Sequence, residues 1–177
     1  PDTLICAIGS ETVIPPIEGI DLPHVAAATN MYDSGFIPGK RVVVIGGGLV
    51  GCETALHLGM IGHDVTVLEM REDVAIDATA DHRRYLMPRL EKHAGIACGM
   101  RVTRITADAV EATGAEGQTY TFPADSVLIA AGLKARSAEV ETLRSSDYDF
   151  IAIGDAKRAR NVFAAVREGF DAATFVR

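Results

Sequence analysis

Tryptophan is absent from this sequence of 177 residues, and the aromatic residues together make up only 6% of it. Cysteine is also scarce. The three cysteines, Cys6, Cys52 and Cys98, are far apart and form no C-x-x-C pair, which excludes a redox dithiol and a zinc site of that type. We interpret them as buried structural thiols, and a reducing, cytoplasmic location is the simplest expectation.

Long apolar runs and an excess of positive charge are missing too. The longest apolar runs have the length of a strand, so no transmembrane helix is expected. The chain begins at Pro1, without an initiator Met or a basic-then-apolar leader, so we expect no secretory signal and a chain cut from a longer protein. The 17 basic residues against 24 acidic ones give a net charge of −7, which argues against a nucleic-acid partner.

Motifs for nucleophilic and metal chemistry are lacking as well. There is no G-x-S-x-G and no cysteine matched with a motif-placed histidine. His57 and His63 are six residues apart, which does not place them on one helix face as metal ligands. We therefore predict no catalytic residue and no metal site in this chain, which suits hydride transfer, where a cofactor carries the chemistry.

One stretch stands out among the residues that are present. It reads RVVVIGGGLVGCETALHLGMIGHDVTVLE over residues 41–69. An apolar run, Val42 to Ile45, leads into G-x-G-x-x-G; a helical pattern follows, and a second apolar run, Val65 to Leu68, ends at Glu69. These features in this order predict one β-α-β unit with a dinucleotide site at its first turn. Within the helix, the spacing predicts a sheet-facing stripe of Val50, Thr54, Leu58 and Ile61.

Each glycine of the turn has a separate expected task. Gly46 permits the tight turn, Gly48 lets the backbone approach a pyrophosphate, and Gly51 lets the helix pack closely on the sheet. The helix N-terminus offers free N–H groups to the phosphates. Glu69 lies where a carboxylate accepts hydrogen bonds from the adenosine ribose. The competing interpretation is a tight turn that binds nothing.

Short strands and two further helices are expected in the rest of the chain. Helices are predicted from Ala78 to His93, with Leu86 and Leu90 inward and Pro88 distorting it, and from Asn161 onward. Residues 11–25 read as an extended connector, followed by a short helix from Ala26 to Tyr32. The expected strands are TLICAI (3–8), IACGMRVTRITA (96–107), AVEAT (109–113), QTYTF (118–122), SVLIA (126–130) and FIAI (150–153). The strands after Gly95 form a β-meander where a plain dehydrogenase half has a helix.

With these motifs in order, the sequence resembles the two-dinucleotide-binding flavoproteins, the pyridine nucleotide–disulfide oxidoreductase fold. It is most similar to the C-terminal region of the NADH:flavin oxidoreductases of the 2-enoate reductase and 2,4-dienoyl-CoA reductase group. The resemblance spans nearly the whole chain and rests on KRVVVIGGGLVGCETALHLGMIGHDVTVLEM, TLICAIGSETVIPPIEGID, SVLIAAGLKA and FIAIGDAKRARNVFAAVREGFDAA.

The resemblance implies an α/β fold with a Rossmann-like three-layer NAD(P)-binding domain, a parallel sheet and a β-meander crossover. That domain is inserted between segments of an FAD domain. Residues 1–38 then end the first FAD segment, 39–143 form the NAD(H) domain, and 144–177 return to the FAD domain. The family's upstream FAD motif, and its barrel domain with FMN and an iron–sulfur cluster, are not encoded here.

The resemblance also assigns site residues. It places Glu53 near the nicotinamide end of NAD(H), although an acid at that point also suits the dipole of the first helical turn. It places Gly154-Asp155 against FAD, although Asp155 could instead cap the final helix. Ala7-Ile8-Gly9 and Ala130-Ala131-Gly132 lack the family's Thr and are expected only as structural crossings. The complete set of expected cofactor-binding residues is Gly46, Gly47, Gly48, Leu49, Val50, Gly51, Glu53, Glu69, Met70, Gly132, Gly154 and Asp155.

The functional expectation is the NAD(H)-binding portion of a multidomain flavin oxidoreductase. It delivers hydride from NADH to FAD for reduction of an activated alkene at another centre, and its partners are the missing FAD and barrel domains. Glu69 favours NADH because a carboxylate repels a 2′-phosphate, whereas the nearby Arg71 could accommodate that phosphate. The alternatives are a stand-alone, non-catalytic dinucleotide-sensing module, FAD at the single glycine motif, and a thioredoxin-reductase-like enzyme, which the missing C-x-x-C disfavours.

Overall fold

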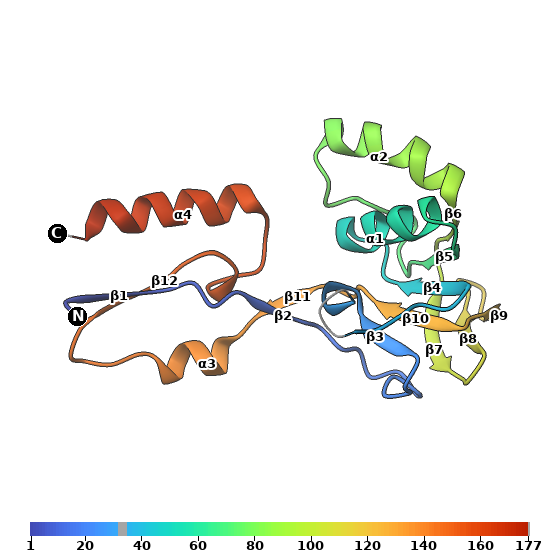
Figure 1. Ribbon diagram of the computed structural model, residues 1–177, viewed down its shortest axis with the longest axis horizontal. Coiled ribbons are helices and arrows are strands. Elements are labelled where there is room, and N and C mark those ends of the chain that lie inside the picture. Colours follow the sequence, from blue (N-terminus) through green and yellow to red (C-terminus); the bar gives the residue numbers. More distant parts are fainter. Residues whose placement is uncertain (32–34, 177) are drawn as a thin grey trace. The chain divides into compact units, whose positions relative to one another are not determined.

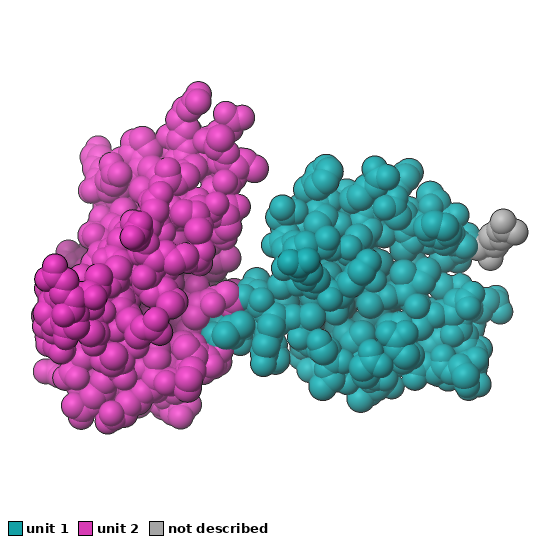
Figure 2. Space-filling view, turned by 180° about the vertical axis from the view of Figure 1, so that it is seen from behind, with its two compact units in different colours: residues 1–13, 133–177 teal, residues 14–132 magenta. Residues whose placement is uncertain are grey.

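The structure is a computed structural model that describes residues 1–31 and 35–176. The chain forms two compact units: residues 14–132 make one, and residues 1–13 with 133–177 make the other. Figure 2 shows the first in magenta and the second in teal. These units divide at 13/14 and 132/133, whereas the sequence-based division set its boundaries at 38/39 and 143/144. One unit is thus continuous in sequence and the other is assembled from both ends of the chain.

A parallel sheet of five strands is the centre of the 14–132 unit (Figure 1). Its strand order is β3-β10-β4-β5-β6, and each neighbouring pair is parallel. This arrangement confirms the expected Rossmann-like α/β fold. The strands are β3 (Val25–Ala27), β4 (Arg41–Ile45), β5 (Asp64–Leu68), β6 (Ala94–Ala97) and β10 (Ser126–Ile129).

Side chains alternate between the two faces of this sheet because successive strand residues point to opposite sides. On β4, Val42 and Val44 pack with α1 (Leu49–Met60) and α2 (Ala80–His93). Val43 and Ile45 pack instead with residues of an antiparallel meander, in the order β7-β8-β9. Helices, sheet and meander give the three expected layers (Figure 1). The meander strands are β7 (Arg101–Ile105), β8 (Ala109–Thr113) and β9 (Thr119–Pro123).

The sheet-facing stripe of α1 differs from the predicted one. Leu58 is buried as expected, but Val50 is 40% and Ile61 is 61% exposed. The buried helix residues are Gly51, Cys52, Ala55 and Leu58. The prediction followed the larger apolar residues, whereas the small ones face the sheet and let the helix backbone approach it closely.

The second helix and the meander follow the sequence in outline. Leu86 and Leu90 on α2 are buried as predicted. The helix runs continuously through Pro88, which lies on the exposed side, where water can reach the carbonyl group that loses its partner. The single strand expected over 96–107 is wrong, because the run splits into β6 and β7. Gly99 lies between them with φ of +68°, and the backbone there turns from the parallel sheet into the meander.

The short helix predicted from Ala26 to Tyr32 is also wrong where it can be compared. Residues 25–27 form β3, an edge strand of the central sheet, and only Ala28–Asn30 form a single 3₁₀ turn. Tyr32 lies outside the described residues. The pairing of β3 with β10 joins segments about a hundred residues apart, which local sequence patterns do not reveal.

The unit made from both chain ends contains two strand pairs and two helices. β1 (Thr3–Cys6) pairs in parallel with β12 (Asp149–Ala152), and β2 (Ser10–Thr12) pairs antiparallel with β11 (Leu133–Ala135). α3 (Ser137–Thr142) and α4 (Val162–Phe175) complete it. Its small core consists of Cys6, Val140 and Ala156 with neighbouring apolar residues.

Within the described parts of the chain, no helix combines the length and the apolar character needed to cross a membrane.

Candidate functional site

The glycine turn connects β4 to the N-terminus of α1. Gly46 follows the strand with φ of +109°, a conformation that favours glycine, and its N–H donates to the carbonyl of Leu68 at 2.9 Å. Gly48 is the N-cap residue, and as a glycine it has no side chain to cap the helix that begins at Leu49. The first N–H groups of α1 therefore receive no hydrogen-bond acceptor from their own N-cap residue.

The turn contains four glycines, and three of them have no room for a side chain. The fourth, Gly48, has room for one. A Cβ at Gly51 would lie 2.0 Å from the carbonyl oxygen of Gly46, and one at Gly46 would lie 2.4 Å from that of Ala130. A Cβ at Gly47 would meet Val74 at 2.5 Å. At Gly48, the described atoms within 4 Å of a Cβ are the carboxylate oxygens of Asp77, at 3.5 and 3.9 Å. Gly48 is thus the position where a ligand can approach the backbone.

Glu69 follows β5, beside the turn, and is only 3% exposed. One carboxylate oxygen accepts the N–H of Gly47 at 2.6 Å. The other accepts the N–H of Arg71 at 2.8 Å and lies 3.3 Å from its Nε. An ionised carboxylate has about four lone-pair sites, so Glu69 can still accept a hydrogen bond from a ribose hydroxyl. The next residue, Met70, is 59% exposed.

Asp77 is a site residue that the sequence did not single out. Its two carboxylate oxygens accept the N–H of Leu49 at 2.9 and 3.1 Å, across 28 residues of sequence. Asp77 thereby caps α1, which Gly48 cannot do. In the sequence it is one acid in a polar loop, and no local pattern indicates which helix it meets.

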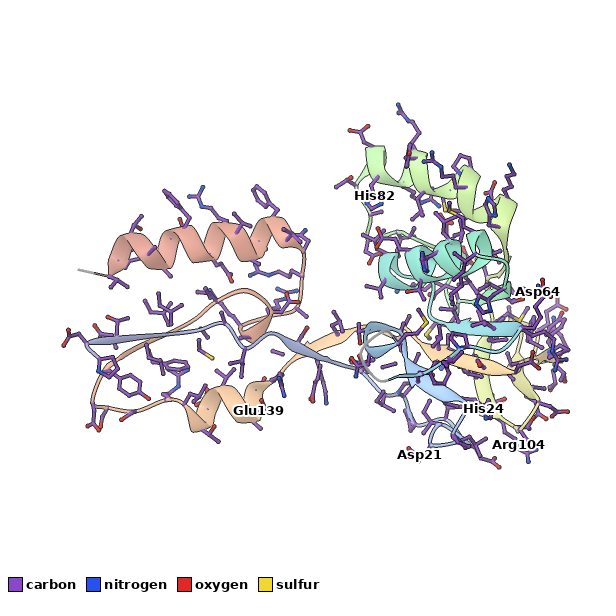
Figure 3. All side chains as sticks on the ribbon, viewed as in Figure 1. Asp21, His24, Asp64, His82, Arg104 and Glu139 are labelled. Atoms are coloured by element: carbon purple, nitrogen blue, oxygen red, sulfur yellow. The ribbon has the colours of Figure 1, made fainter. Side chains whose placement is uncertain are left out.

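Glu53 does not act on the first turn of α1. The helix begins at Leu49, which puts Glu53 in the second turn, so the expected dipole role at the first turn is wrong. Its carboxylate lies 3.2 Å from Nε2 of His82. His82 lies near the start of α2 (Figure 3), so the pair joins the two helices that cover this face of the sheet.

Cys52 lies under the turn and is fully buried. Its thiol donates to the carbonyl of Gly47 at 3.4 Å, and burial raises the pKa of Cys52 to about 11. A thiol with so high a pKa is a poor nucleophile at neutral pH, which agrees with a structural role. In the described residues, no group of three or more His, Cys, Asp and Glu side chains is arranged to hold a metal.

Gly154 and Asp155 lie in the other unit, in a 3₁₀ turn after β12. The N–H of Gly154 donates to the carboxylate of Glu168 at 2.7 Å. Asp155 accepts from the hydroxyl of Ser10 at 3.2 Å and from the N–H of Arg160 at 3.1 Å. The alternative that Asp155 caps the final helix is wrong, because the side chain of Asn161 caps α4.

Gly132 and Gly9 both have positive φ, +111° and +78°, a conformation that favours glycine in a tight turn. Both were expected only as points where the chain crosses between domains. They lie close to the two points where the chain passes between the compact units.

The sequence profile of the pyridine nucleotide-disulphide oxidoreductase family matches residues 1–169. The chain belongs to this family. Bilirubin reductase from Mediterraneibacter gnavus strain CC55_001C is 41% identical over 175 residues, which are 98% of this chain and 27% of that protein. NADH oxidase from Thermoanaerobacter brockii is 38% identical over 184 aligned positions, 98% of this chain and 28% of that protein.

A solved structure gives the same assignment of fold. The complex of 2-naphthoyl-CoA reductase with 2-naphthoyl-CoA matches all of this chain and 27% of its own, with a TM-score of 0.91 and 29% identity. The chain therefore spans little more than a quarter of the length of these pyridine nucleotide-disulphide oxidoreductase relatives. Family membership, together with the NADH oxidase relative, implies NAD(H) and FAD as cofactors.

The two cofactors of this family fit the chain to different degrees. The open position at Gly48 and the spare acceptor capacity of Glu69 fit a dinucleotide, although Asp77 already accepts the N–H of Leu49 at the start of α1. The residues around Gly154 offer less, since the N–H of Gly154 is already bound by Glu168. Asp155 retains acceptor capacity and can contribute to FAD binding only as part of a larger site.

Proposed function

We propose that this chain is the NAD(H)-binding portion of a multidomain flavin-dependent oxidoreductase of the 2-enoate reductase and 2,4-dienoyl-CoA reductase group. NADH bound at the glycine turn delivers hydride to FAD, and the electrons pass to another centre that reduces an activated alkene. In this scheme the present chain binds and orients the nucleotide, and other parts of the protein hold most of the flavin and the substrate.

The observation that carries the proposal is the combination of Gly48 and Glu69. Gly48 has no side chain to keep a pyrophosphate from the backbone at the helix N-terminus, where Asp77 accepts the Leu49 N–H, and Glu69 stands at the end of the adjacent strand with acceptor capacity for the ribose. N–H donors for a phosphate and a carboxylate acceptor for a ribose hydroxyl, at neighbouring strand ends, match the two polar parts of an adenine dinucleotide.

Glu69 supports NADH rather than NADPH. The Nε of Arg71 lies 3.3 Å from the Glu69 carboxylate, so the guanidinium is paired with the acid that would repel a 2′-phosphate. The side chain of Arg71 remains 56% exposed, and its Nη groups stay available to a phosphate, so the preference for NADH rests on the charge of Glu69.

Binding of FAD requires more chain than is present here. A hydrogen bond to a charged group contributes about 1.5–3 kcal/mol, whereas micromolar affinity needs about 8 kcal/mol, so Asp155 alone is insufficient. The unit that contains Asp155 also has a parallel sheet of only two strands, β1 and β12. Such a sheet needs further strands or covering layers, which we assign to the FAD domain outside this chain.

A reductive reaction is supported by the relatives, since bilirubin reductase and 2-naphthoyl-CoA reductase are both named as reductases. The NADH oxidase relative supports NADH as the electron source. The particular alkene is a property of the missing domains, so no residue here is assigned to it.

Titration calorimetry with Gly48→Ala tests the nucleotide site. A Cβ at Gly48 makes only ordinary contacts within the described protein, so the variant should keep its fold. The same Cβ obstructs the pyrophosphate, and overpacking of about 1–3 kcal/mol weakens NADH binding by roughly 5- to 150-fold. Circular dichroism and the thermal midpoint serve as the fold control.

Four results would contradict parts of this proposal. Equal NADH affinity of the wild type and Gly48→Ala would remove the glycine turn from the site. Tighter binding of NADPH than of NADH would overturn the cofactor preference. A yellow protein with a flavin spectrum would place FAD at the single glycine motif, and steady NADH oxidation by the isolated chain would contradict its role as a portion that needs a flavin domain.

A further inference from the structure

We propose that Asp77 is a built-in competitor for the pyrophosphate position, so that a dinucleotide must displace its carboxylate from the N-terminus of α1. This inference rests on the proposed function, because it concerns the same glycine turn. The additional claim is that the Asp77 carboxylate takes the place of the pyrophosphate at the Leu49 N–H when no nucleotide is bound.

The chain's own acids occupy both ends of the glycine turn. Glu69 accepts the N–H of Gly47, and Asp77 accepts the N–H of Leu49. The two acids differ in burial, since Glu69 is 3% exposed whereas Asp77 is an exposed residue. Glu69 is therefore fixed in place, and Asp77 is the acid that a ligand can replace.

The position of Asp77 coincides with the open side of the turn. Its oxygens are the described atoms nearest to a Cβ built on Gly48, the glycine at which a pyrophosphate approaches the backbone. A phosphate that accepts the Leu49 N–H and a carboxylate that accepts the same N–H cannot both be there. The negative charges of the phosphate and the carboxylate also repel each other when both groups lie beside the same N–H.

The loop that carries Asp77 is anchored on its N-terminal side. The N–H of Ala75 donates to the carbonyl of Gly47 at 2.7 Å, and Val74 and Ala75 are buried. Ala75 has φ of +51°, a strained conformation for alanine that the surrounding packing maintains. Displacement of Asp77 therefore needs only rotation of an exposed side chain, with the loop backbone left where it is.

Asp77→Asn separates competition from capping. Asparagine keeps an oxygen that can cap the helix but lacks the negative charge, so the thermal midpoint should fall only slightly while the competing anion is gone. An anion at a helix N-terminus is stabilised by about 0.3–1 kcal/mol, so removing the competing anion should tighten ADP-ribose binding by about two- to fivefold. The matched control is Glu72→Gln, which removes one charge from an exposed position of the same loop.

Calorimetric titration of ADP-ribose into the wild type and both variants tests whether Asp77 competes with the pyrophosphate. Tighter binding by Asp77→Asn alone supports the inference. Unchanged affinity in Asp77→Asn, or an equal gain in both variants, overturns it while leaving the nucleotide site intact. Weaker binding by Asp77→Asn would show that the carboxylate helps the ligand and would also overturn it. No ADP-ribose binding by any of the three proteins would overturn the proposed function together with this inference.

Discussion

At the scale of single residues, the glycines of the turn fall into two kinds. Gly46, Gly47 and Gly51 are glycines because the protein itself leaves no room for a side chain. Gly48 has room, and its lack of a side chain matters for what approaches from outside. The G-x-G-x-x-G pattern does not distinguish the two kinds, since the crowding atoms of Val74 and Ala130 come from distant segments.

Gly51→Ala should destabilise the protein, whereas Gly48→Ala should not. Helix propensity favours alanine over glycine by up to about 1 kcal/mol, but a Cβ 2.0 Å from a backbone oxygen forces the helix and turn apart. We expect a net loss of about 1–3 kcal/mol for Gly51→Ala and a change within about 0.5 kcal/mol for Gly48→Ala. Urea unfolding measures both, and equal stability of the two variants would contradict this division of the glycines.

At the scale of secondary structure elements, the sequence was informative where a pattern is local. The β4–α1–β5 unit follows from two apolar runs, a glycine motif and an acid within 29 residues, 41–69. The meander was recognisable because its strands are neighbours in sequence. By contrast, β3 was assigned to a helix, and the Asp77 cap went unnoticed, because each is defined by a partner far along the chain. The predicted stripe on α1 is wrong apart from Leu58, because the other buried residues of the helix are small: Gly51, Cys52 and Ala55.

The start of β4 is held to β10 by Arg41 and Asp125. The backbone N–H of Arg41 donates to the Asp125 carboxylate at 2.8 Å, and its guanidinium pairs with the same group. Hydrogen bonding from the Arg41 side chain and then from its backbone lowers the pKa of Asp125 to about 2. An unfolded aspartate has a pKa of about 3.9, so the ionised pair stabilises the folded state above that pH.

Asp125→Asn should therefore lower stability at neutral pH by removing the ion pair. Because the folded-state pKa is depressed, the stabilisation by Asp125 is complete above the unfolded pKa and is lost as pH falls towards 2. The difference in urea midpoint between wild type and Asp125→Asn should be constant from about pH 7 to 5 and should shrink between about pH 4 and 2. If the difference in urea midpoint stayed the same down to pH 2, the charge of the Asp125 carboxylate would contribute nothing to the stability of the folded state.

At the scale of the whole molecule, the unit formed by the two chain ends carries an apolar helix surface. Val162, Phe163, Val166, Phe170 and Phe175 of α4 are 66–80% exposed. A cluster of several large, exposed apolar side chains marks a surface that contacts further protein. The chain spans only 27–28% of the bilirubin reductase and NADH oxidase relatives, and we propose that the flavin domain outside this chain covers the helix.

Replacing Phe163 and Phe170 by serine should reduce binding of the dye ANS to the isolated chain. Both side chains are largely exposed, at 80% and 66%, so the double variant should stay within about 1 kcal/mol of the wild type in stability. Arg167→Ser on the same helix is the control and should leave the dye signal unchanged. An unchanged signal in the double variant would show that this face does not behave as an apolar surface.

The central claim is that the turn at Gly46–Gly51, together with Glu69, binds NAD(H), and backbone amide NMR tests it most directly. On titration of ¹⁵N-labelled protein with NADH, the account predicts saturable shifts that are largest at the amides of Gly48, Leu49, Val50 and Met70. Absence of shifts at saturating NADH, or shifts concentrated in residues 133–176 instead, would contradict it.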